Sequence, residues 1–87
     1  PTISMFYGIL VLMFFRDKGV IIYRIFMYLT SDEAFVSIEE GNVIDGNLLP
    51  KQLKMVQAWI EIHKEELMVD WELAVNGDEP FRIAPLQ

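Results

Sequence analysis

Residues 50–77 read PKQLKMVQAWIEIHKEELMVDWELAVNG and decide the fold. Apolar residues recur there at steps of three and four, which is typical of an amphipathic helix with a broad buried face. Pro50 suits a first helical turn, and Asn76-Gly77 supplies a stop. We predict one long helix over about 50–76, roughly 39 Å at 1.5 Å per residue. That length favours a kink between Glu66 and Asp70. The stripe consists of Leu53, Val56, Ile60, Leu67, Trp71 and Ala74.

The residues before this helix have the composition of β-strands. Residues 3–15 are rich in β-branched and aromatic types, and we expect one long strand or two collinear ones, with Gly8 as a bend or bulge. Further strands are expected at 20–29, 34–38 and 43–45, joined by short turns that favour an antiparallel meander. Prolines 80 and 85 predict an extended tail over 80–87. The predicted fold is α+β: a single domain, 1–87, with a sheet of three to four strands over 3–45 and one long helix packed on one face.

The composition excludes several classes of function. The 87 residues include 13 acidic and 7 basic side chains, for a net charge of −6, which disfavours binding to nucleic acid. There is no cysteine and one histidine, so thiol catalysis and multi-ligand zinc sites are excluded. No phosphate-binding glycine motif is present. We therefore expect no enzyme activity, no cofactor, no metal and no small-molecule substrate.

The first 29 residues are apolar enough to raise the question of a membrane. Twenty of them are apolar or aromatic, but the longest unbroken run, Ile9 to Phe15, has seven residues. Arg16, Asp17 and Lys18 then interrupt, whereas a spanning helix needs about 20 apolar residues. A secretory signal would need a basic start and a small-residue cleavage site. We expect a soluble cytoplasmic protein with no membrane partner.

The strand segments carry apolar residues on both faces. An antiparallel sheet with one wet face alternates apolar and polar side chains, but residues 9–15 and 20–29 are apolar on both parities. A single helix covers one face only. The other face would expose a patch of several hundred Å², which is large for a monomer. The pattern indicates an interface with another protein surface.

Three segments carry a resemblance to a known family: PTISMFYGI at 1–9, QLKMVQAWIEIHKEEL at 52–67, and DWELAVNG at 70–77 with the FRI and PL that follow. Together they resemble the small bacterial proteins grouped as domain of unknown function 4160. The resemblance covers nearly the whole chain. It implies no established activity, and some members lie beside a second small protein, which suggests toxin–antitoxin pairs.

One segment departs from that family. Members typically carry a Pro-His-apolar-His motif, and here Tyr23 stands at the position of the proline, with Arg24 and Phe26 at those of the histidines. A large apolar residue, Leu12, also stands where a polar one is common. Such changes grouped on one face resemble a redesigned interface. The leading hypothesis is an engineered variant that binds itself or a designed partner chain. The alternative is a natural family member, such as a toxin–antitoxin component. The predicted interface consists of Leu12, Phe14, Ile22, Arg24, Phe26 and Tyr28.

Three other features have a chemical and a structural interpretation. His63 with Glu66 has the spacing of half a metal site, but one histidine leaves it incomplete, and we expect a boundary histidine with a hydrogen-bonded ring. The acidic residues 65, 66, 70 and 72 could form an acid–base pair, but a solvated helix face is the simpler interpretation. A free N-terminal Pro1 could act as a base, as in the tautomerases, but no other segment resembles them.

Overall fold

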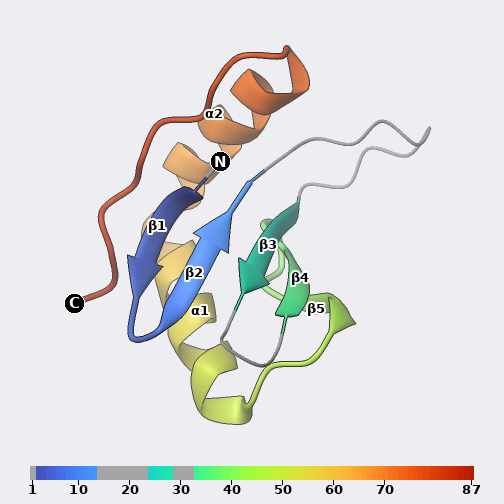
Figure 1. Ribbon diagram of the computed structural model, residues 1–87, viewed down its shortest axis with the longest axis vertical. Coiled ribbons are helices and arrows are strands. Elements are labelled where there is room, and N and C mark those ends of the chain that lie inside the picture. The colour runs from blue at the N-terminus through green and yellow to red at the C-terminus, as the bar shows by residue number, and fades with distance from the viewer. Residues whose placement is uncertain (1, 14–23, 29–32) are drawn as a thin grey trace.

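The computed structural model describes residues 2–13, 24–28 and 33–87. Its five strands form one antiparallel sheet in the order β1-β2-β3-β4-β5, and two helices follow in the sequence. Figure 1 looks onto the sheet with α1 behind it and the C-terminal residues running beside β1. The elements are β1 (Thr2–Phe6), β2 (Ile9–Leu12), β3 (Arg24–Tyr28), β4 (Glu33–Ser37), β5 (Val43–Gly46), α1 (Pro50–Ile62) and α2 (Lys64–Val75).

The α+β class is confirmed, but the number of strands and the single helix are not. Residues 3–15 were expected to run in one direction, whereas the chain reverses at Tyr7-Gly8. Both turn residues have positive φ, 48° and 77°, as the tight hairpin turns that match strand twist require. Phe6 therefore pairs with Ile9 and Met5 with Leu10. This hairpin adds a strand to the sheet.

The predicted helix is divided in two at His63, before the segment where we expected a kink. His63 has φ −112° and ψ 23°, outside the helical region, and it ends α1 and begins α2. A straight helix over 50–76 would be about 39 Å long, whereas the longest extent of the molecule is 33 Å. Divided at His63, the helices of 13 and 12 residues are each about 20 Å long at 1.5 Å per residue, well within that extent.

The helix ends follow the sequence signals. Pro50 occupies the first turn of α1, and the amide N–H of Leu49 donates to the side-chain oxygen of Gln52 at 3.0 Å. At the other end Gly77 has φ 81°, and the N–H of Asp78 donates to the carbonyl of Leu73 at 2.8 Å. Both ends satisfy backbone groups that would otherwise lack partners.

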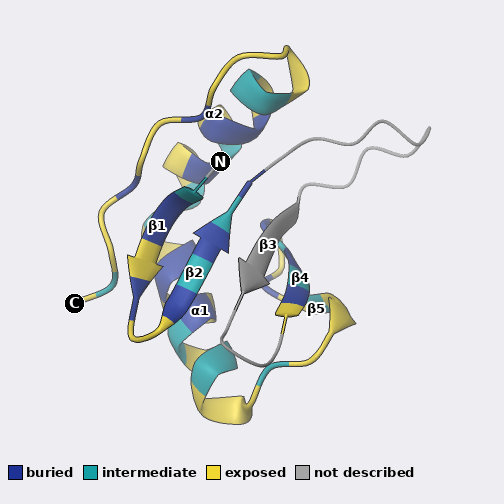
Figure 2. Ribbon diagram, in the orientation of Figure 1, coloured by how far each residue is buried: buried dark blue, intermediate teal, exposed yellow. Residues whose placement is uncertain are grey.

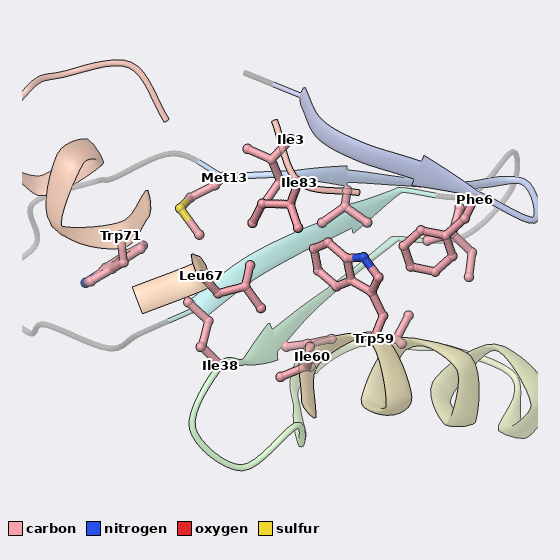
Figure 3. Packing of buried hydrophobic residues seen from close by; sticks show 13 residues of the cluster. Ile3, Phe6, Met13, Ile38, Trp59, Ile60, Leu67, Trp71 and Ile83 are labelled. Carbon is pink, nitrogen blue, oxygen red and sulfur yellow. The ribbon is translucent and has the colours of Figure 1, made fainter. Parts of the chain in front are cut away.

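The core lies between the sheet and the helices. Trp59 is fully buried and packs against Phe6, with ring centroids 5.4 Å apart. Figure 3 shows Trp59 pointing from α1 toward the sheet, near Phe6 and Ile83. The buried cluster includes Ile3, Ile9, Val11 and Met13 from the first hairpin, Val36 and Ile38 from β4 and its end, Val56, Trp59 and Ile60 from α1, Leu67 and Trp71 from α2, and Ile83.

The approach of β4 to Gly46 makes this glycine hard to replace. Its φ is 84°, and a Cβ there would lie 2.1 Å from the carbonyl oxygen of Glu33. Gly77 is the matched control, because its φ is 81° and a Cβ there meets nothing within 4 Å. We expect Gly77→Ala to cost about 1 kcal/mol from the backbone conformation alone. Gly46→Ala should cost roughly 2 kcal/mol more, since backbone must also move. Urea denaturation of both variants checks this, and equal losses would contradict it.

Candidate functional site

The sheet has one face that the described helices do not cover. Along β2, Ile9 and Val11 are fully buried in the core, whereas Leu10 and Leu12 alternate with them and are only half-buried. Figure 2 shows this alternation along β2, beside the exposed part of β1. Met5 is paired with Leu10 and is 61% exposed. Since directly paired residues lie on the same side of a sheet, these side chains form one surface.

The pairing between strands shows which positions on β3 and β4 lie on the same side of the sheet as Leu10 and Leu12. Leu12 is paired with Phe26 and Leu10 with Tyr28, and Phe26 is paired in turn with Phe35 of β4. Phe35 is half-buried between Ala34 and Val36, which point into the core. We call Met5, Leu10, Leu12 and Phe35 the outer face. Its border on β4 and β5 is polar, with Glu33, Ser37 and Asp45 at the neighbouring positions.

The structure places four of the six predicted interface residues in strands, and the other two lie outside the described residues. Leu12 lies on the outer face. The backbone of Arg24, Phe26 and Tyr28 lies in β3 at positions paired with Ser37, Phe35 and Glu33. Phe14 and Ile22 lie outside the described residues. The sequence interpretation missed Met5 and Phe35. Met5 was missed because the hairpin at Tyr7-Gly8, which turns it outward beside Leu10, was taken for a bend.

His63 at the break between the helices is a packed residue with a carboxylate partner. Its Nδ1 lies 2.6 Å from Glu66 Oε1, and its ring lies 5.6 Å from that of Trp59, between centroids. The hollow beside it, about 700 Å³, is bordered by residues 61–66 and Met68 only. Within the described ranges, no three His or carboxylate side chains come close enough to hold a metal ion. The pair therefore joins the helices, and the described residues offer it no further ligand.

Asp70 is the one fully buried carboxylate among the described residues. Its Oδ1 accepts a hydrogen bond of 3.0 Å from the amide N–H of Phe81, while no donor from residues 2–13, 24–28 or 33–87 reaches Oδ2. Burial raises the pKa of the Asp70 carboxyl above its ordinary value, the Phe81 amide opposes this, and the negative charge of Glu66 adds to it. The predicted solvated acidic face is therefore wrong for this residue.

Comparison with known proteins identifies the family. The family model described as "Domain of unknown function (DUF4160)" matches residues 8–72, which is most of the chain. The chain belongs to the DUF4160 family. The match extends from the turn of the first hairpin into α2, so it includes β2 and β4 of the outer face but not β1, which carries Met5. No curated protein and no solved structure matches the chain. Among the described residues, no helix is both long and apolar enough to span a bilayer.

Proposed function

We propose that this DUF4160 protein is a binding protein without enzyme activity, and that it associates with a second copy of itself through the outer face. The observation that carries the proposal is the position of Met5, Leu10, Leu12 and Phe35 on the side of the sheet opposite the helices. Aromatic residues and methionine are enriched at the centres of protein interfaces. Burying this face against a partner would remove apolar surface from water.

Charge favours a second copy over other partners. The chain carries a net charge of −6, so it would repel nucleic acid and anionic lipid surfaces. It would also repel a copy of itself unless the contact surface were uncharged. Residues 2–13, which form β1 and β2, contain no Asp, Glu, Lys or Arg. Two copies related by a two-fold axis could therefore bring these strands together without opposing like charges.

The test is the native mass in solution at micromolar concentration, compared between two matched variants. Met5→Lys places a charge on the outer face, and in a two-fold dimer each substitution counts twice. We expect association to weaken by about tenfold or more, since 1.4 kcal/mol is a factor of ten. Ile62→Lys changes a side chain of similar exposure, 66%, on α1 and should leave association unchanged.

Light scattering during size-exclusion chromatography gives the mass directly. A monomeric wild-type chain at these concentrations would overturn the proposal. So would an oligomer that Ile62→Lys disrupts and Met5→Lys leaves intact, because the contact would then lie on the helices.

A further inference from the structure

The last ten residues, 78–87, form a strap that runs along the open edge of β1. They contain no helix or strand. Besides the bond from Asp78 N–H to Leu73 that ends α2, three hydrogen bonds of the described residues attach them. Phe81 N–H donates to Asp70 Oδ1 at 3.0 Å, Ile83 N–H donates to the carbonyl of Ile3 at 2.8 Å, and the indole N–H of Trp59 donates to the carbonyl of Ala84 at 2.9 Å. Figures 1 and 3 show the strap beside β1, with Ile83 next to Ile3.

The attachments differ in kind. Ile83 is buried in the core, and its amide adds one strand-like bond to the edge of β1. These contacts and the bond from Trp59 depend on neutral groups. The contact with Asp70 depends on a group that can ionise.

The position of Asp70 makes its charge costly while the strap is in place. The side chain is fully buried, and one oxygen accepts a single amide hydrogen bond, whereas the part of the chain that the structure describes offers the other oxygen no donor. A buried carboxylate needs several donors to replace the water it loses. Since the strap contributes the one donor to Asp70 found among the described residues, release of residues 78–87 would let water reach the charged group.

We propose that the strap is a proton-linked latch on the edge of β1, closed when Asp70 is protonated and released when Asp70 is ionised. Thermodynamic linkage gives the direction: the closed state binds the proton more tightly than the open state, so closure is favoured at low pH and lost as the pH rises. The pKa of Asp70 is raised by burial in the closed structure, which agrees with tighter proton binding in that state.

The described charged side chains nearest to Asp70 lie on α2 and on the strap. On α2, Glu66 lies one turn before Asp70 and is itself paired with His63. On the strap, Asp78, Glu79 and Arg82 flank Phe81 and are exposed, so water screens them. Residues 2–13 contribute no Asp, Glu, Lys or Arg. Among the described charged side chains, Glu66 is therefore the one that acts on Asp70, and its negative charge favours the protonated form.

The experiment is amide hydrogen exchange of the full chain between about pH 4 and about pH 8, corrected for intrinsic exchange. The probes are the amides of Phe81 and Ile83, which the strap bonds protect. Their opening constant should rise with pH, by about tenfold for each unit by which the pKa of Asp70 differs between the closed and open states. The amide of Leu67, bonded to the carbonyl of His63 within the helices, reports global unfolding and should not follow it.

Two variants decide the outcome. Asp70→Asn keeps an acceptor oxygen for Phe81 but cannot ionise, so its strap should stay protected across the whole range. Glu66→Gln removes a negative charge that raises the pKa of Asp70 in the closed state, so the rise of the opening constant with pH should be smaller than in the wild type. Equal pH dependence in wild type and Asp70→Asn would overturn the proposal. A wild-type strap whose protection does not change with pH would overturn it as well.

Discussion

Replacing Trp59 with alanine is expected to destabilise the protein by about 3–5 kcal/mol, as for other buried aromatic residues. Trp59 is fully buried, packs on Phe6 and donates its indole N–H to Ala84, so it joins α1, the first hairpin and the strap. The expected loss is a large part of the total stability of about 5–15 kcal/mol usual for a domain. The midpoint of urea denaturation should fall sharply.

Two control variants separate the contributions of Trp59. Trp59→Phe keeps an aromatic ring against Phe6 but loses the hydrogen bond to Ala84, and we expect a loss of about 1–3 kcal/mol, because the carbonyl loses its donor. Ile62→Ala, on the exposed side of α1, should change stability by less than about 0.5 kcal/mol. The role assigned to Trp59 would be wrong if Trp59→Ala cost no more than Ile62→Ala.

The sequence predicts the elements whose signals are local. The apolar stripe of residues 53–74 indicates helix, and Pro50 and Gly77 stand at its ends in the structure. The break at His63 has no such signal, since no glycine or proline lies there, and an unbroken helix would exceed the 33 Å extent of the molecule. The hairpin at Tyr7-Gly8 was missed because the residues on both sides favour strands equally, and tyrosine is uncommon at positive φ.

The candidate sites were predicted only in part, because some of their contacts depend on local sequence patterns and others on how distant segments fold together. The alternation of Leu10 and Leu12 with buried neighbours is a local pattern, so the apolar outer side of β2 could be anticipated. The contact between Asp70 and Phe81 joins residues eleven positions apart across a turn and an irregular strap. No periodicity places these two groups together, so a carboxylate on a helix was assigned to the solvent.

We expect the gene to show that residues 21–28 are encoded one nucleotide out of frame. This segment is where the chain departs from the family resemblance, with Tyr23, Arg24 and Phe26 in place of a Pro-His-apolar-His motif. Triplets that begin at the third nucleotide of each codon restore that motif. A tyrosine codon ending in C followed by CG of an arginine codon gives CCG, which encodes proline.

The next junctions continue the motif. Each triplet takes the last nucleotide of one codon and the first two of the next, so Arg24–Ile25 can give CAT, Ile25–Phe26 TTT and Phe26–Met27 CAT. The shifted triplets therefore encode Pro-His-Phe-His, and Met27–Tyr28 then gives GTA, valine. Methionine has a single codon, ATG, which supplies the AT of the second histidine triplet and the G of the valine triplet. Few other residues at position 27 would allow both. One insertion or deletion of a nucleotide before this segment and a compensating one after it, both within about residues 19–31, would confine the shift of reading frame to this segment.

Sequencing the gene decides between this origin and design. The Pro-His-Phe-His reading requires Tyr23 to be encoded by TAC, Arg24 by CGC, Ile25 by ATT and Phe26 by TTC. Any other codon for Arg24 or Phe26 would refute it, because the shifted triplet would then not encode histidine. A designed interface places no such demand on codon choice. If the shifted frame is found, the natural protein has one histidine at position 26, which is paired with both Leu12 and Phe35, and another at position 24, which is paired with Ser37. Self-association would then depend on Met5, Leu10, Leu12 and Phe35 alone, and the Met5→Lys comparison should be made on the restored chain.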